Sequence, residues 1–133
     1  MNNAPEMEIR KTIRGSLPRV PFETIAKKAL PRGYQLSLVI CGDQLAQRMN
    51  ITYRQKSYRP NVLSFPNDKL EGEIFLNVRC AAREAKKFNI PYAERLALLF
   101  AHGCLHLAGL DHGNAMESKE KSLLKAAGFI ETD

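Results

Sequence analysis

The chain contains three histidines, and all of them fall within one short segment. His102, His106 and His112 are spaced as H-x3-H-x2-G-x2-H, with Gly109 between the second and the third. Residues four apart on an α-helix lie on the same face about one turn apart, so the first two imidazoles point the same way. Glycine favours the left-handed conformation that ends a helix, and the chain can then return His112 toward the other two. Three imidazoles with an open fourth position are the ligands of catalytic zinc, so the spacing predicts one bound Zn²⁺.

The residue that follows His102 limits what such a metal would do. Metzincin proteases share this spacing but carry a glutamate there, which activates water, and this chain has Gly103. A structural zinc usually has four protein ligands, and only three are found here. Hydrolysis without a carboxylate base favours an electrophile activated by charge, such as a phosphodiester held by the metal and an arginine. The alternative is a helix that happens to carry two histidines with no metal, and nickel, cobalt or copper would also bind three imidazoles.

The histidines follow a helix that must run through the middle of the protein. Pro91 opens this helix, and Leu96–Ala101 is apolar on every side, which is typical of a buried helix. Imidazoles on a buried helix need a partner or a metal, because an unpaired buried polar group costs about 1–3 kcal/mol. Cys104 lies about 200° around the helix from His102, so it is expected to face away from the metal.

Hydrophobic periodicity, proline and glycine predict the elements around this helix. They are an edge strand (Glu8–Ile13), a helix (Pro21–Leu30), a buried strand (Leu36–Cys41), a helix with Asp43 as N-cap running to Tyr53, a polar loop (Lys56–Asn61), a short strand (Val62–Phe65) closed by Pro66, a strand (Glu73–Val78), a basic helix (Arg79–Phe88) and a last helix capped by Asn114. Because strands and helices are mixed, we predict one α+β (mixed α/β) domain over residues 1–133. In it, a small mixed sheet packs against the central helix that carries the metal motif.

Composition restricts the class of protein. A chain of 133 residues with 44% apolar content is enough for one domain with an ordinary core. No run approaches the roughly 20 apolar residues of a membrane span, and the first residues lack the apolar stretch of a secretory signal. The three cysteines (Cys41, Cys80 and Cys104) form no C-x2-C pair. This usage predicts reduced thiols, no membrane association and a cytoplasmic location.

The charge of the chain favours an anionic partner. The formal net charge is +6, and residues 1–95 hold 17 of the 20 lysines and arginines but only 9 of the 14 acidic residues. For a basic domain of this size, nucleic acid is the first partner to consider, and a solvated basic surface without a partner is the alternative. Two groups of basic residues are candidates for contact with RNA, namely Arg10, Lys11, Arg14, Lys27, Lys28 and Arg32, and Arg79, Arg83, Lys86 and Lys87.

Three segments together resemble the YbeY family of bacterial ribosomal-RNA maturation factors. They are His102-Gly-x-Leu-His-Leu-x-Gly-x-Asp-His112, Asn61-Val-Leu-Ser-Phe-Pro66 and Thr52-Tyr-Arg54, and the resemblance runs from about Ile40 to Phe129. It implies a single-strand-specific, zinc-dependent endoribonuclease. The implied roles are maturation of the small-subunit rRNA 3′ end and ribosome quality control, with rRNA and the ribosome or small-subunit proteins as partners.

The resemblance assigns functions to individual residues. His102, His106 and His112 would hold zinc and an activated water, and Arg54 would bind the substrate phosphate as a catalytic residue. A guanidinium suits that role because it can hold two phosphate oxygens and stabilise the charge of the transition state. Asp111 is expected to orient one of the histidines, or else to be a simple turn residue. Ser64 is a candidate hydrogen-bond donor to RNA.

Two hypotheses therefore follow from the sequence. In the first, the chain is a metal-dependent endoribonuclease, and the attacking oxygen comes from water or from the RNA 2′-hydroxyl. In the second, it is a non-catalytic ribosome-assembly factor whose metal only fixes the last helix to the central one. Replacing Arg54 separates them, because a catalytic arginine loses activity with binding largely kept, whereas a docking arginine loses both.

Overall fold

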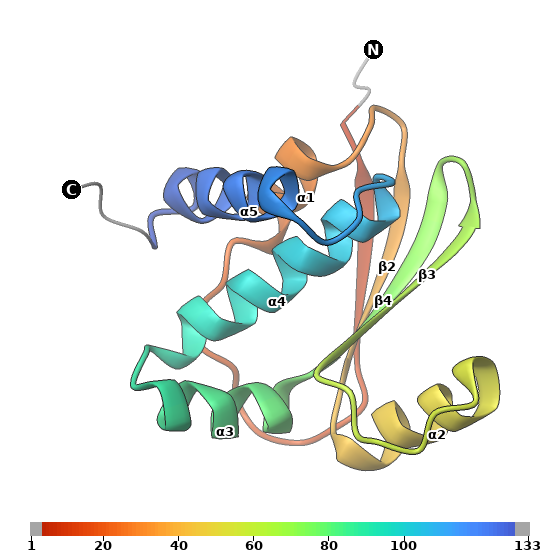
Figure 1. Ribbon diagram of the computed structural model, residues 1–133, viewed down its shortest axis with the longest axis vertical. Helices are drawn as coiled ribbons and strands as arrows, with labels where there is room; N and C mark the ends of the chain where they lie inside the picture. Colours follow the sequence, from red (N-terminus) through yellow and green to blue (C-terminus); the bar gives the residue numbers. More distant parts are fainter. Residues whose placement is uncertain (1–3, 130–133) are drawn as a thin grey trace.

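The computed structural model describes residues 4–129. Four strands and five helices follow one another as β1 (Glu6–Lys11), α1 (Phe22–Ala29), β2 (Gln35–Cys41), α2 (Asp43–Arg54), β3 (Val62–Asp68), β4 (Glu71–Asn77), α3 (Val78–Phe88), α4 (Tyr92–Leu107) and α5 (Asn114–Ala126). Figure 1 shows them as one mixed α/β unit with the sheet on one side and α4 crossing it. The predicted fold class is confirmed, and no described helix is long and apolar enough to cross a membrane.

The four strands form one mixed sheet in the order β1-β2-β4-β3. β1 and β2 are parallel, β2 and β4 are parallel, and the short turn between β3 and β4 makes these two antiparallel. β4 therefore lies inside the sheet although it is the last strand in the chain. β1 and β3 are the edges, and β3 is the edge nearer the histidines.

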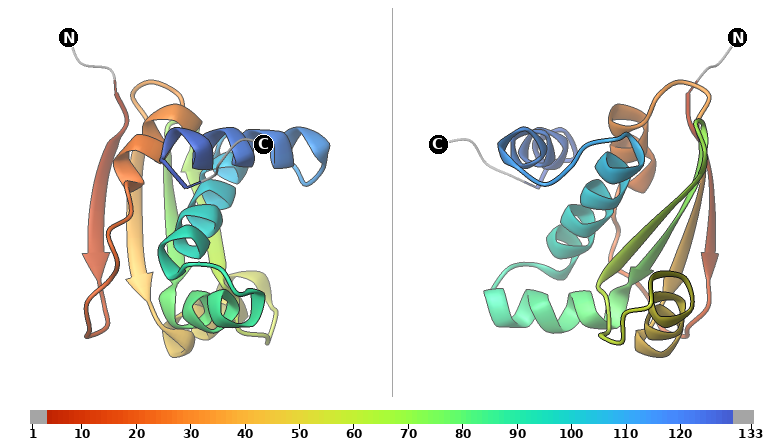
Figure 2. Two further views of the ribbon diagram at one scale, coloured as in Figure 1. Left: turned by 90° about the vertical axis from the view of Figure 1, so that its left-hand side faces the viewer. Right: turned by 45° about the vertical axis from the view of Figure 1, so that its right-hand side comes forward.

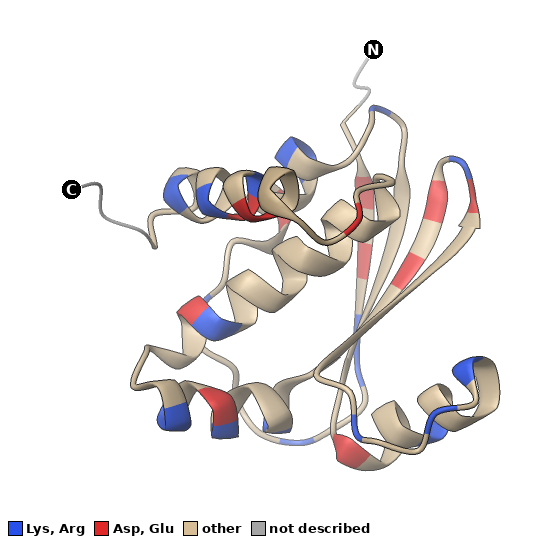
Figure 3. Cartoon of the chain, in the orientation of Figure 1, with Lys and Arg blue, Asp and Glu red and all other residues tan. Residues whose placement is uncertain are grey.

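Side chains on the two faces of the sheet enter two separate apolar clusters, as the alternation along a strand requires. Leu36, Leu38 and Ile40 of β2 point to the face that is covered by α1, α4 and α5. Val39 and Cys41 point to the other face, where α2 packs across one end of the sheet. Figure 2 shows α4 and α5 together on one side of the sheet and α2 apart from them. α4 is thus enclosed, and along its length the charged residues lie only near its N-terminal end (Figure 3).

Two predicted helix caps are wrong. Asp43 is the first residue of α2, not its cap, and the preceding residue is Gly42. Its carboxylate instead accepts hydrogen bonds from Arg83 of α3 at 2.7 and 2.9 Å and from Asn77 at 3.0 Å, so tertiary partners take the oxygens that a cap would use. Asn114 is likewise the first residue of α5, and no side chain caps this helix.

The strand that begins at Val62 does not stop at Pro66 but continues to Asp68. Proline has no backbone N–H to donate to the sheet. It is tolerated there because β3 is an edge strand, where a backbone nitrogen on the open side takes no part in the hydrogen-bond ladder. A register shift between Pro66 and Asp68 marks the irregularity. β1 and β4 also begin two residues before their predicted starts.

Candidate metal centre and cleft

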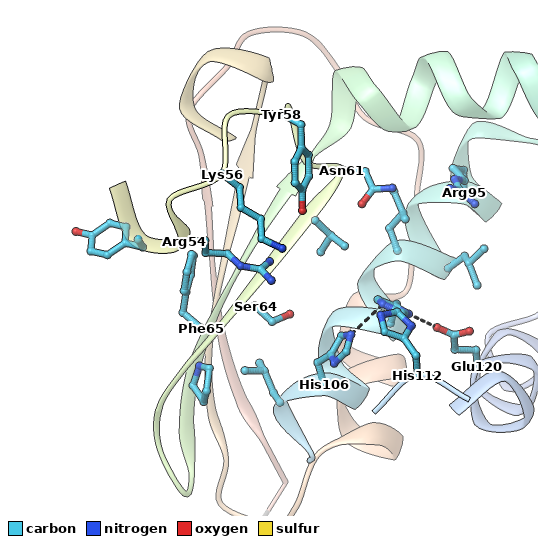
Figure 4. A pocket seen from close by; sticks show the side chains of 17 residues that line it. Arg54, Lys56, Tyr58, Asn61, Ser64, Phe65, Arg95, His106, His112 and Glu120 are labelled. Atoms are coloured by element: carbon cyan, nitrogen blue, oxygen red, sulfur yellow. Dashed lines mark hydrogen bonds and ion pairs between the residues drawn. The ribbon is translucent and has the colours of Figure 1, made fainter. Parts of the chain in front are cut away.

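The last two turns of α4 and the loop after it bring the three histidines together. Gly109 has φ +94°, and its amide donates to the carbonyl of His106, so the chain turns back at this glycine as predicted. One nitrogen of each imidazole lies within 4.8 Å of the other two. The Nε2 atoms of His102 and His106 are 3.0 Å apart, and His112 reaches them from the loop (Figure 4). This arrangement fits the short spacing between ligand nitrogens in a tetrahedral zinc site.

The other ring nitrogen of His102 has a partner on the last helix. Its Nδ1 lies 2.6 Å from Oε2 of Glu120, and the Glu120 side chain is 13% exposed. A carboxylate there holds the proton on Nδ1, which leaves the Nε2 lone pair free toward the other two rings. The site therefore fixes both the tautomer and the orientation of one ligand.

The surroundings keep His106 in the form that binds metal. Burial and the neighbouring rings of His102 and His112 lower the pKa of His106, so the imidazole stays neutral and retains a lone pair. Cys104 is fully buried on the opposite side of the helix, as predicted, and burial raises the pKa of its thiol. The three cysteines are free, and Cys104 takes no part in the site.

Packing explains why the residue after His102 is glycine. A Cβ at Gly103 would lie 3.0 Å from Oγ of Ser64, 3.1 Å from Ile74 and 3.4 Å from Val62. The helix therefore rests directly on β3 and β4 at this point. A glutamate at this position would have to displace the sheet, so the water-activating base of a metzincin has no room here.

A cleft of about 930 Å³ opens beside the histidines, between α4 and the segment that links α2 to β3. Its walls are the C-terminal end of α2, most of the length of α4, the edge strand β3 and one residue of α5. Its lining residues are Tyr53, Arg54, Lys56, Tyr58, Asn61, Val62, Ser64, Phe65, Pro66, Arg95, Leu98, Leu99, His102, His106, Leu107, His112 and Glu120. The structure thus places Arg54 and Ser64 in one cleft with all three predicted metal ligands.

The cations of the cleft differ in whether they have a partner. Arg95 pairs with Glu84 at 2.9 Å, and the same carboxylate accepts from Asn61 at 3.2 Å. In contrast, Arg54 and Lys56 form no ion pair with any residue between 4 and 129. Both side chains extend over the cleft toward Ser64 and the histidines (Figure 4). Their charges are therefore available to an anionic ligand.

Two other predicted site residues have different surroundings. The hydroxyl of Ser64 donates to the carbonyl of Gly103 at 3.1 Å, so its proton is already used and its oxygen can only accept from a ligand. Asp111 is exposed and makes no hydrogen bond to a histidine within the described chain. The carboxylate that contacts a histidine is Glu120, eight residues beyond His112. No local pattern identifies Glu120, because its position depends on how α5 packs on α4.

Comparison with known proteins finds similarity to one family along nearly the whole chain. A family profile described as "Endoribonuclease YbeY" matches residues 2–128. A protein of that name from Alkaliphilus oremlandii is 33% identical over 112 residues, which cover 73% of this chain and 74% of the relative. One from Campylobacter jejuni is 34% identical over 112 residues and covers 78% and 82%. One from Alkaliphilus metalliredigens is 28% identical over 145 residues and covers 97% and 94%.

A solved structure shares the fold. The solution structure of TM1509 from Thermotoga maritima superposes with a TM-score of 0.63 and 22% sequence identity. The superposition covers 90% of this chain and 89% of that one. The arrangement of one mixed sheet with α4 across it is therefore found in an experimentally determined protein.

Proposed function

The chain belongs to the YbeY family of endoribonucleases, and on that premise we propose that it is a zinc-dependent enzyme that cleaves single-stranded RNA. One observation supports this proposal above the others. Three converging imidazoles and two cations without a carboxylate partner in the described chain line the same cleft. A metal site next to unneutralised positive charge suits the phosphodiester backbone of a nucleic acid.

The metal would be held by His102, His106 and His112. When bound, zinc supplies a Lewis acid that polarises a phosphoryl oxygen and lowers the pKa of water. Glu120 orients His102 and holds its proton on Nδ1. Among the described residues these three side chains would hold the metal, and catalytic zinc sites typically have three protein ligands with the fourth position left for water or substrate.

Arg54 would act on the phosphate itself. Its guanidinium ends in the cleft, and the helix that carries it stops at Gln55, which has the left-handed φ of 54°. A bidentate arginine can bind the phosphate and stabilise the negative charge that grows on it in the transition state. Ser64, with its oxygen facing the cleft, would accept a hydrogen bond from a ribose hydroxyl. Lys56 would add charge that attracts the backbone.

We propose rRNA as the physiological substrate, in particular the 3′ end of the small-subunit rRNA, with the ribosome or small-subunit proteins as partners in the cytoplasm. The support is the resemblance of the three sequence segments and the net charge of +6. The second hypothesis, an assembly factor with a structural metal, shares the basic charge but does not account for two cations without a carboxylate partner in the described chain beside the histidines.

Cleavage of a 3′-extended small-subunit rRNA fragment tests the proposal. Purified protein of known zinc content is compared with His102→Ala, and circular dichroism verifies that both are folded. We expect cleavage by the wild type alone, and loss of that cleavage when a chelator removes zinc. The ends of the products identify the attacking group, since a 2′,3′-cyclic phosphate indicates the 2′-hydroxyl, whereas a 5′-phosphate opposite a 3′-hydroxyl indicates water.

Equal cleavage by both proteins would indicate a contaminating nuclease. If neither cuts free RNA, the same comparison is repeated on small ribosomal subunits that carry the extended 3′ end. Absence of zinc-dependent cleavage there as well would refute the proposal and leave the assembly-factor hypothesis.

A further inference from the structure

A tyrosine projects into the cleft without a ring partner. Tyr58 lies in the segment between α2 and β3 and is 53% exposed. None of the aromatic pairs or cation–ring contacts in the described chain includes it. Figure 4 shows its ring extending from the segment toward the interior of the cleft. A large apolar face that faces a binding cleft and lacks an intramolecular partner is open to a ligand.

The segment that carries Tyr58 is held firmly to α2. The side-chain amide of the fully buried Asn50 donates to the carbonyl of Tyr58 at 3.0 Å. Gln47 donates to the carbonyl of Ser57 at 2.9 Å, and the amide of Lys56 donates to the carbonyl of Asn50 at 3.2 Å. These three hydrogen bonds fix the backbone on both sides of the tyrosine. The backbone that carries the ring is thus in place before a ligand arrives, which lowers the entropy cost of ordering this segment on binding.

The neighbours of Tyr58 indicate the kind of ligand. In Figure 4 the side chains of Arg54 and Lys56 extend into the cleft beside Tyr58, and Phe65 lines the same cleft. Phe65 belongs to a second aromatic group, in which Tyr53, 63% exposed, meets it edge-on with ring centroids 5.8 Å apart. Positive charge flanked by aromatic rings is the arrangement that holds single-stranded nucleic acid, with phosphates on the cations and bases on the rings.

We propose that Tyr58 is a base-stacking residue, on which an unpaired base rests when the adjacent phosphate lies at Arg54 and Lys56. This inference rests on the proposed function and specifies how that cleft recognises its substrate. A base inside a duplex is covered by its neighbours on both faces and is not available to the ring. Tyr58 therefore selects for unpaired RNA, and it does so without reading the identity of the base.

Substitutions at Tyr58 separate stacking from other roles. Tyr58→Leu keeps an apolar side chain but removes the aromatic face, whereas Tyr58→Phe keeps the face and removes only the hydroxyl. Binding of a fluorescein-labelled single-stranded oligonucleotide with 2′-O-methyl riboses and phosphorothioate linkages, which resists cleavage, is followed by anisotropy with the zinc-loaded proteins, and a gel verifies that it stays intact. We expect the leucine variant to bind roughly 5- to 150-fold more weakly and the phenylalanine variant to bind like the wild type.

A fluorescent reporter detects the stacked base directly. The chain has no tryptophan, so Tyr58→Trp introduces a single one in the cleft. Ile9→Trp is the matched control, because Ile9 is 49% exposed on β1, at the edge of the sheet away from the cleft. We expect a single-stranded oligonucleotide to quench the cleft tryptophan, and a chain of equal length with abasic sites to bind without quenching it. Neither should quench the control.

Equal quenching by the abasic chain, or unchanged affinity in Tyr58→Leu, would overturn the stacking role. These results do not depend on cleavage. If the wild type cleaves RNA but Tyr58→Leu binds and cleaves equally well, the proposed function holds and the stacking role fails. If the tryptophan is quenched only when bases are present but no substrate is cleaved, the stacking role holds and the nuclease proposal fails.

Discussion

Nδ1 of His102 lies 2.6 Å from Oε2 of Glu120, and this contact joins the central helix α4 to the last helix α5. Of the residues that line the cleft, Glu120 alone comes from α5. The contact gives α5 a direct role in the geometry of the metal site, beyond the apolar contacts of Leu123 and Leu124 with the core.

Removing this carboxylate should weaken metal binding without unfolding the protein. We expect Glu120→Ala to lower zinc affinity by about 10- to 100-fold, because His102 loses the partner that fixes its tautomer and orientation. Competition with a chromophoric chelator measures the affinity. Glu117→Ala is the control, since Glu117 is exposed on the same helix and does not line the cleft. Equal affinity in the two variants would contradict the role of Glu120.

Loss of the Arg54 guanidinium should affect catalysis more than binding. We expect Arg54→Ala to lower kcat by about 10²- to 10³-fold, which is typical for removal of one group that stabilises transition-state charge. Arg54→Lys should recover only part of the rate, because an ammonium cannot bind a phosphate in a bidentate manner. Single-turnover cleavage measures the rate, and Arg48→Ala, on the same helix outside the cleft, should retain the wild-type rate. A large rise in KM with unchanged kcat would show that Arg54 only docks the RNA.

The pairing of Asp43 with Arg83 should make stability depend on pH in the acid range. Hydrogen bonds from Arg83 lower the pKa of Asp43 to about 2, below the value of about 3.9 in an unfolded chain. A lowered pKa adds stability that is fully present above the unfolded value and is lost as the pH falls from about 4 to 2.

Because Arg83 is 54% exposed, solvent screening reduces this contribution to about 1 kcal/mol. Urea unfolding of the wild type and Asp43→Asn over this range measures it. The variant should be less stable at neutral pH and should lose less stability on acidification. Asp68→Asn, at the exposed end of β3, should follow the wild type, and parallel pH profiles for wild type and Asp43→Asn would refute the prediction.

A methyl group added at Gly72 should destabilise the protein through one buried tyrosine. Its Cβ would collide with the hydroxyl of Tyr34 and approach Leu107 to 2.9 Å. Tyr34 is fully buried and cannot move aside, so we expect Gly72→Ala to lower the free energy of unfolding by about 1–3 kcal/mol.

The hydroxyl of Tyr34 has no hydrogen-bond partner among residues 4–129, so Tyr34→Phe alone should leave stability unchanged or raise it. Combined with Gly72→Ala, it should restore part of the lost stability. Thermal unfolding of the two single variants and the double variant measures this coupling. Additive effects would show that the collision is with Leu107 instead.

The metal motif could be predicted from sequence because its geometry is local. The helix period brings His102 and His106 to one face, and Gly109 turns the chain so that His112 returns, all within one short segment. The apolar surroundings of Leu96–Ala101 likewise required this helix to be central. The predicted mixed sheet packed against this helix is confirmed. It could be predicted because alternating and continuous apolar residues along the sequence indicate which segments form strands and helices.

The parts that could not be predicted depend on contacts between distant segments. Asp43 has the residue type and position of a helix cap, but Arg83 and Asn77 reach it only after α3 packs beside α2. In the sequence, Glu120 cannot be distinguished from an exposed helix residue, because its contact with His102 exists only when α5 packs on α4. Tyr58 carries no sequence signal either, because its exposure follows from the hydrogen bonds of Asn50 to the segment around it.

The position of β4 between β2 and β3 has a consequence for the order in which the protein becomes active. During synthesis, the inner strand is the last of the four to be made, so the edge that lines the cleft cannot reach its final place before residue 77. The three imidazoles and Glu120 follow later still, between residues 102 and 120. A growing chain therefore contains Arg54 and Tyr58 before it contains the three histidines, and the contact between His102 and Glu120 can form only once α5 has been made.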